Sequence, residues 1–161
     1  QRQHRALPVH SWELIVPGSG ADKVTADTRV CDVMTTNLFT VRPEDLLDLA
    51  TSTMEWRHVR HVPVENATGE LVGLLSTREL LRLSSTEREA GEQPIPVSGL
   101  MQLDPPTISP DVALREACRR ILETDSGCLL VVDRGQLLGI ITERDLLEAS
   151  VKLISGDEKE D

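Results

Sequence analysis

Hydrophobic and polar residues follow the same order twice along the chain. Each half has two short apolar runs around a glycine-containing turn, at residues 59–64 and 71–75 in the first half and 128–132 and 137–141 in the second. Short apolar runs that flank such a turn are typical of a β-hairpin. The pattern therefore predicts one hairpin in each half.

Ahead of each hairpin, apolar residues recur at a spacing of three and four, which predicts an amphipathic helix. The apolar positions are Leu46, Leu47, Ala50 and Met54 in the first half, and Leu114, Ala117, Cys118, Ile121 and Leu122 in the second. Ser109-Pro110 also favours a helix start, with Ser109 as the N-cap and Pro110 at the first helical position. After each hairpin we expect a terminal helix, at residues 77–83 and 143–154.

A short turn and a short strand open each half, at residues 30–34 and 38–41 and again at 97–101 and 107–108. The predicted order is thus β-α-β-β-α, twice. The copies align with one single-residue gap, after Asn66. A repeat of about 50 residues is a supersecondary unit that needs its copy to bury its apolar face, and two copies are too few for a solenoid. The prediction is an α/β fold of the α+β type, in which a pseudo-twofold pair of repeats encloses a cleft.

These patterns divide the chain into five segments. The repeats occupy residues 30–83 and 97–154, joined by an acidic, proline-containing linker at 84–96. Residues 1–29 form an N-terminal extension with a possible short strand at 12–16, and residues 155–161 form a charged tail. Met34 and Met101 occupy matching positions, and we expect both at the interface between the repeats.

Composition narrows the choice of partners. The 161 residues carry a formal net charge of −10, which argues against nucleic acid or an anionic membrane as partner. No apolar run approaches the roughly 20 residues of a membrane span, and no signal-peptide pattern opens the chain. The three cysteines lack C-x-x-C spacing, and no His or Cys spacing suits a metal. We therefore expect a cytoplasmic protein with reduced thiols.

The most informative local pattern lies where the last strand of each repeat meets the terminal helix. It reads Gly-Ile-Ile-Thr-Glu-Arg-Asp at residues 139–145 and Gly-Leu-Leu-Ser-Thr-Arg-Glu at 73–79. One interpretation is structural: Thr142-x-x-Asp145 and Ser76-x-x-Glu79 fit capping boxes. The other is functional: the hydroxyl and the Arg bind a phosphate at the helix N-terminus, and the acid accepts hydrogen bonds from a diol.

The two motifs, inside the two repeats, resemble a pair of cystathionine β-synthase (CBS) domains. The resemblance covers residues 30–147 and includes Thr40-Val41-x-Pro43, Thr107-Ile108-x-Pro110 and the segment 60–64, Arg-His-Val-Pro-Val. It implies two three-stranded sheets that face each other, with up to two nucleotide sites in the cleft. Such pairs sense AMP, ADP, ATP or S-adenosylmethionine and regulate an attached or partner protein, such as an enzyme or a transporter; they are not catalysts.

The resemblance also assigns roles to residues. Asp145 matches the family's ribose-binding acid, with Thr142 near the phosphate, and Arg144 is the Arg that binds phosphate in the functional interpretation above. Ser76, Arg78 and Glu79 are their counterparts, but Glu79 replaces the usual Asp, so we rank the Asp145 site above the Glu79 site. The remaining expected contacts are Thr40 and Thr107 beside the base, with Val62, Pro63, Leu129 and Leu130 as its aliphatic walls.

His58, Arg60 and His61 form a basic cluster in an acidic chain. The match to the family places Arg60 and His61 at the cleft, where they would contact phosphate, and histidine would make affinity depend on pH. Alternatively, they cap a hairpin edge or pair with Glu55 and Glu65. The second repeat has Gly127-Cys128 at these positions, so a phosphate cluster would be one-sided.

The sequence thus favours a regulatory module that binds an adenine nucleotide and needs no obligatory cofactor. A ligand-free module for dimerisation or scaffolding is the alternative, and no arrangement of nucleophile and base supports an enzyme. The apolar helical positions given above exceed what two short sheets bury, so we also expect a homodimer.

Overall fold

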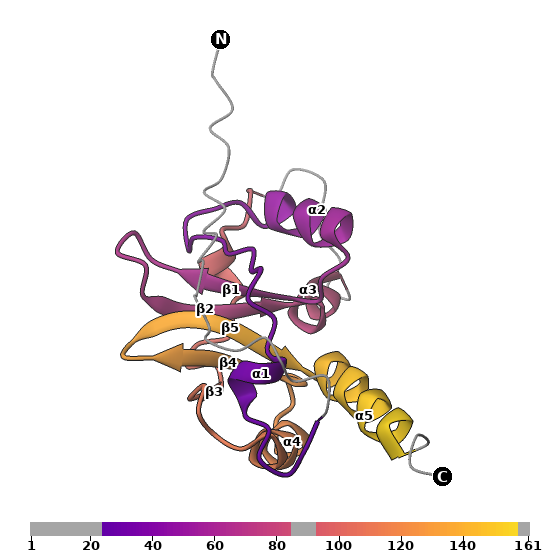
Figure 1. The fold of residues 1–161 in the computed structure, drawn as a ribbon. Helices are drawn as coiled ribbons and strands as arrows, with labels where there is room; N and C mark the ends of the chain where they lie inside the picture. Colours follow the sequence, from indigo (N-terminus) through magenta and orange to yellow (C-terminus); the bar gives the residue numbers. More distant parts are fainter. Residues whose placement is uncertain (1–23, 85–92, 158–161) are drawn as a thin grey trace.

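The computed structural model describes residues 24–84 and 93–157 (Figure 1). The strand expected at 12–16 lies outside this range, as do most of the expected linker and the end of the expected tail.

Both halves contain the predicted helices and hairpin in the predicted order. The first half comprises α1 (Val30–Val33), α2 (Leu47–Arg57), β1 (His61–Glu65), β2 (Leu71–Ser76) and α3 (Thr77–Ser84). The second half comprises a 3-10 turn at Val97–Gly99, β3 (Thr107–Ile108), α4 (Leu114–Glu123), β4 (Cys128–Asp133), β5 (Gln136–Thr142) and α5 (Glu143–Asp157).

The hairpins form where the sequence predicts them. β1 pairs antiparallel with β2, and β4 pairs antiparallel with β5. The turns need left-handed backbone, which glycine supplies without a steric penalty: Gly69 has φ of 82° and Gly135 has φ of 79°.

The expected opening strands form unequally. β3 pairs in parallel with β4, whereas residues 38–41 contribute only one parallel bridge, from Val41 to Val64. In the second half the Leu130 N–H donates to the Pro106 carbonyl at 2.9 Å. The residue matching Leu130 is Pro63, which has no N–H to donate. The first sheet therefore has two full strands and a single-residue edge.

The prediction that α4 begins at Ser109-Pro110 was wrong, because the helix begins at Leu114. Residues 109–112 form a turn whose carbonyls face α1. The Pro110 carbonyl accepts from the Cys31 N–H, and the Val112 carbonyl accepts from the Val30 N–H, both at 2.9 Å. These bonds hold the turn against α1.

The first segment of each half packs into the core of the other half. α1 contacts α4 and α5, and Val30 is fully buried in the core of the second half. Val97 is fully buried in the core of the first half. Met34 lies against Gly139 and Met101 against Gly73, so both methionines lie at the interface between the repeats, as predicted.

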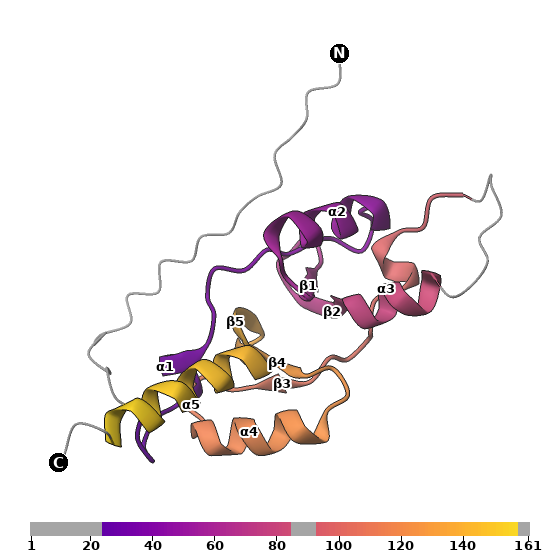
Figure 2. The same ribbon diagram turned by 90° about the vertical axis from the view of Figure 1, so that its right-hand side faces the viewer.

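The sheets face each other between outer helices, with α2 and α3 on one side and α4 and α5 on the other (Figures 1 and 2). Leu74 of β2 packs between the sheets with a cluster from β4 and β5: Cys128, Leu130, Leu137 and Ile140. Truncating one such buried leucine to alanine typically costs about 2–5 kcal/mol. Along the described residues, no helix combines the length and apolarity needed to cross a membrane.

Candidate functional site

A cleft of about 1310 Å³ lies between the halves, which is ample for a nucleotide-sized ligand. The first half contributes the C-terminal part of α2, the start of β1 and one face of α3. The second half contributes the end of β5 and the first turns of α5. The residues that line the cleft include Thr35, Thr51, Met54, Glu55, His58, Arg60, His61, Thr77, Leu80, Leu81, Gly127, Ile140, Thr142, Glu143, Arg144, Asp145 and Glu148.

Asp145 is the most heavily hydrogen-bonded carboxylate of the cleft. Its Oδ2 accepts from the Thr142 N–H at 2.7 Å and from the Thr142 hydroxyl at 2.8 Å. The Asp145 N–H donates to Thr142 Oγ1 at 3.4 Å, which completes a capping box. A carboxylate has about four acceptor positions. The capping interaction therefore leaves Oδ1 available for a further donor, and the structural and functional interpretations of the motif are compatible.

Thr35, from the first half, supplies that further donor. Its hydroxyl donates to Asp145 Oδ1 at 2.9 Å. Its backbone exchanges two hydrogen bonds with Ile140, both at 2.9 Å. Sequence reasoning missed Thr35, because the matching residue is Gln102 and a comparison of the repeats does not mark the position as shared. The only available signal was its position directly after Met34, a residue already assigned to the interface.

His61 connects the two halves at the cleft. Its Nε2 lies 2.8 Å from the Ser126 carbonyl. A carbonyl only accepts, so Nε2 carries the proton and Nδ1 is the remaining acceptor. Burial lowers the pKa of His61 below its ordinary value, although the carbonyl contact opposes this effect. The imidazole is therefore neutral near pH 7.

Arg60 lines the cleft beside His61 and is exposed. Within residues 24–84 and 93–157 it has no ion-pair partner, so the expected alternative of pairing with Glu55 or Glu65 is not found. Glu65 accepts instead from the Thr40 hydroxyl at 3.3 Å, and neither residue lines the cleft.

Three further carboxylates line the cleft. Glu148 pairs with Arg144, with Nε and Oε1 3.1 Å apart, and both side chains are largely exposed. Glu143 lies over Gly127, where a Cβ would approach its carboxylate to 3.3 Å. Glu55 is on the last turns of α2. These acids were not among the residues that we expected in the site.

The structure does not bring all of the predicted residues to the cleft. Val62, Pro63, Leu129 and Leu130 are fully buried in the core, so their side chains offer no exposed wall for a base. Thr107 is exposed on β3 but does not line the cleft. Of the predicted set, the cleft contains Arg60, His61, Thr142, Arg144 and Asp145.

The Glu79 motif has the same local structure but different neighbours. Glu79 accepts from the Ser76 N–H at 3.0 Å and from the Ser76 hydroxyl, as in a capping box. Arg78 donates from Nη1 to the Asp125 carbonyl at 2.6 Å, across the two halves. Ser76, Arg78 and Glu79 do not line the large cleft.

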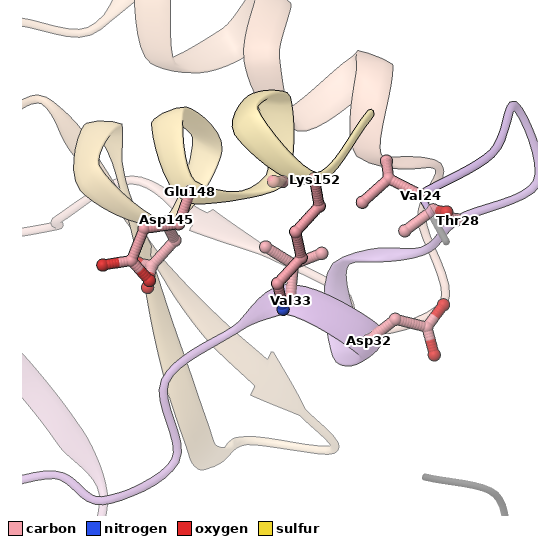
Figure 3. A pocket seen from close by; sticks show the side chains of 8 residues that line it. Val24, Thr28, Asp32, Val33, Asp145, Glu148 and Lys152 are labelled. Atoms are coloured by element: carbon pink, nitrogen blue, oxygen red, sulfur yellow. The ribbon is translucent and has the colours of Figure 1, made fainter. Parts of the chain in front are cut away.

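A smaller cavity of about 90 Å³ lies on the other side of Asp145, between α1 and α5 (Figure 3). Lys152 extends from α5 toward Val33, with Asp32 on the neighbouring helix (Figure 3). Across the described ranges, no group of three His, Cys, Asp or Glu side chains is arranged to hold a metal ion.

Known proteins share both this sequence pattern and this architecture. The chain is 28% identical over 134 residues to a CBS domain-containing protein of Dictyostelium discoideum, and it spans 92% of that protein. It is 30% identical over 117 residues to the CBS domain-containing protein YhcV of Bacillus subtilis, of which it spans 81%. By contrast, it spans only 14% of the A-adding tRNA nucleotidyltransferase of Aquifex aeolicus.

Solved structures of other proteins have the same fold as this chain. The acetoin utilization protein AcuB of Vibrio cholerae superposes with a TM-score of 0.74 and 29% identity, over 84% of this chain and all of that one. CBSX2 in complex with AMP superposes with a TM-score of 0.68 and 30% identity, over 78% of this chain and 98% of that one. The family model of the CBS domain matches twice, at residues 30–86 and 97–152. This chain therefore belongs to the CBS domain family and carries two CBS domains in tandem.

Proposed function

We propose that this protein is a regulatory module that binds an adenine nucleotide in the cleft around Asp145. The observation that carries the proposal is the convergence of both halves on one carboxylate, since Thr35 of the first half and Thr142 of the second both donate to Asp145. AMP, ADP, ATP and S-adenosylmethionine share the adenosine moiety that such a site would bind.

In this proposal Asp145 binds the ribose diol. The diol offers two hydroxyl donors, and Oδ1 is the carboxylate oxygen outside the capping interaction. Ligand hydroxyls would replace or share the Thr35 hydroxyl there. Arg60, from the facing half, would approach the phosphate, with His61 and Arg144 beside it.

The relatives support the ligand class. CBSX2, 30% identical, has been solved in complex with AMP. The CBS domain pair of MJ0100 has been solved with 5′-methylthioadenosine and S-adenosylmethionine, and at 17% identity it supports only the shared fold.

A thermal-shift screen with AMP, ADP, ATP, GMP and S-adenosylmethionine tests the proposal. A ligand that binds only the folded state stabilises it by RT ln(1 + [L]/Kd), about 2.7 kcal/mol at a hundred times Kd. We expect the melting temperature to rise with at least one adenine ligand. Unchanged melting with every ligand would favour the alternative, a ligand-free module for dimerisation or scaffolding.

We also propose that the module forms a homodimer, although the exposed apolar surface includes only part of the one we expected. Leu47, Ala50, Met54, Leu114, Ala117 and Ile121 are buried in the chain's own core. Of the expected positions, Leu46 and Leu122 are exposed, and further exposed apolar side chains include Trp56 on α2, Leu81 on α3, and Leu147, Val151 and Ile154 on α5. Contiguous exposed apolar surface commonly marks an interface. Light scattering that gives 17.8 kDa at high protein concentration would contradict dimerisation.

The regulated partner in this proposal is an attached or separate enzyme or transporter, and the module itself is not a catalyst. Relatives such as the Aquifex nucleotidyltransferase contain a matching segment within a much longer chain. Cys31, Cys118 and Cys128 are free thiols, which is consistent with the proposed cytoplasmic location.

A further inference from the structure

Carboxylates outnumber guanidinium groups in the large cleft. Glu55, Glu143, Asp145 and Glu148 line it, against the guanidinium groups of Arg60 and Arg144. Four carboxylates against two guanidinium groups leave a formal charge of −2 before any ligand enters. The whole chain, at −10, adds to this negative potential.

The two arginines are not equally available. Arg144 already pairs with Glu148, with 3.1 Å between Nε and Oε1. An anion that recruits Arg144 must compete with this carboxylate. Arg60 has no ion-pair partner among the described residues, so it is the cation of the lining that can meet an incoming phosphate without breaking a pair.

His61 and two N–H groups at the start of α5 add little positive charge to the cleft. His61 donates its Nε2 proton to the Ser126 carbonyl, and burial keeps it neutral by lowering its pKa. At the start of α5, the Glu143 N–H donates to the Gly127 carbonyl at 3.2 Å, and the Asp145 N–H donates to Thr142 Oγ1. These N–H groups, which would otherwise favour an anion at a helix N-terminus, are already satisfied.

We propose that the cleft selects adenosine ligands that carry one phosphate or none over ligands that carry three. This inference rests on the proposed function and refines it. Arg60 can neutralise part of a monophosphate. A triphosphate would place its additional negative charge among Glu55, Glu143 and Glu148, and like charges at short range repel strongly in a partly enclosed site.

Calorimetric titration of the full chain with AMP and with ATP, both without Mg²⁺, tests the inference. We expect ATP to bind at least tenfold more weakly than AMP, with the ratio falling as added salt screens the charges. The matched variant is Glu148→Gln, which removes one carboxylate and releases Arg144. It should raise the affinity for ATP more than the affinity for AMP.

Asp133→Asn is the control, because it makes the same change of charge on an exposed residue at the far end of β4 and outside the cleft. It should leave the ratio of affinities unchanged. ATP binding as tightly as AMP would overturn the inference and leave the proposed function intact. A preference for AMP that Glu148→Gln does not reduce would overturn the electrostatic origin. Absence of binding by AMP, by ATP and by S-adenosylmethionine would overturn the proposed function as well.

Discussion

The two halves share a fold but present different chemistry to each other. Asp145 lines the cleft together with Arg60 and His61, which the first half supplies. At the positions that match Arg60 and His61, the second half has Gly127 and Cys128, which offer no cation. Burial raises the pKa of the Cys128 thiol to about 12, so it is a neutral core side chain. The repeat therefore preserves backbone and packing while the side chains at the proposed site diverge.

The residues that follow the paired methionines show the same divergence. Thr35 and Gln102 make equivalent backbone bridges, to Ile140 and Leu74 respectively. Only the Thr35 side chain reaches the acid of the adjoining motif, since its hydroxyl donates to Asp145. Among the described residues no hydrogen bond joins Gln102 to Glu79. The difference teaches that the surroundings of each acid depend on residues from both halves, so one motif does not define the proposed site.

The largest expected contrast is between Asp145→Ala and Glu79→Ala. Loss of hydrogen bonds to a charged acceptor costs about 1.5–3 kcal/mol, so Asp145→Ala should weaken AMP binding by tenfold to more than a hundredfold. Glu79→Ala should change affinity far less. Calorimetry on both variants measures the contrast, and equal losses of affinity for AMP would contradict it.

The capping interaction provides an internal control for this pair. Both acids cap a helix, so both variants should lose about 1 kcal/mol of stability while remaining folded. Chemical denaturation measures this loss. A much larger loss for Asp145→Ala alone would mean that its effect on affinity is structural.

The next contrast concerns the two interface glycines. A Cβ on Gly139 would lie 2.8 Å from the Thr35 carbonyl oxygen, and one on Gly73 would lie 2.7 Å from the Met101 sulfur and 3.0 Å from the Gln102 carbonyl oxygen. Overpacking typically costs about 1–3 kcal/mol. Gly139→Ala should be the more damaging, because backbone yields less than a methionine side chain. Urea unfolding of both variants tests the order, and a smaller loss for Gly139→Ala would contradict it.

The smallest expected effect is on the pH dependence of stability. His61 has a lowered pKa in the folded state, so the unfolded chain binds its proton more readily. The contribution of His61 to the stability of the folded state is therefore complete when the pH is above 6.5, the ordinary pKa of histidine. This contribution is lost as the pH falls below that value. His61→Gln keeps a donor for the Ser126 carbonyl but does not titrate. Its stability should fall less than that of the wild type on acidification.

His58→Gln is the matched control, since it removes an exposed imidazole from the same cleft. Melting curves between about pH 7.5 and pH 5 measure both variants against the wild type. An acid-induced loss that persists unchanged in His61→Gln would contradict the assignment to His61.

Periodicity predicted the hairpins and helices because these elements depend on local apolar spacing and on glycine turns. The N-cap and proline signal failed at Ser109-Pro110, where a tertiary contact with α1 holds a turn in place of a helix. Periodicity did not show that residues 38–41 would barely pair, which depends on the missing N–H of Pro63 in another strand.

The site was predicted less completely. Thr142, Arg144, Asp145, Arg60 and His61 line the cleft because their motifs sit at strand ends that face the other half. Thr35, Glu55, Glu143 and Glu148 were missed, because their roles arise from how the two halves meet. Leu129 and Leu130 were expected as walls, yet their side chains face the core on both sides of a covered sheet.

The most direct test of the central claim is a titration of the ¹⁵N-labelled protein with AMP, in which NMR monitors the backbone amide signals. The proposed site predicts that Thr35, Arg60, Thr142 and Asp145 shift together and stop shifting when one ligand per chain is bound. Signals of Ser76 and Glu79 should change little over the same range. Equal shifts at Glu79 and Asp145, saturating at two ligands per chain, would contradict the unequal sites, and shifts confined to other residues would contradict the site itself.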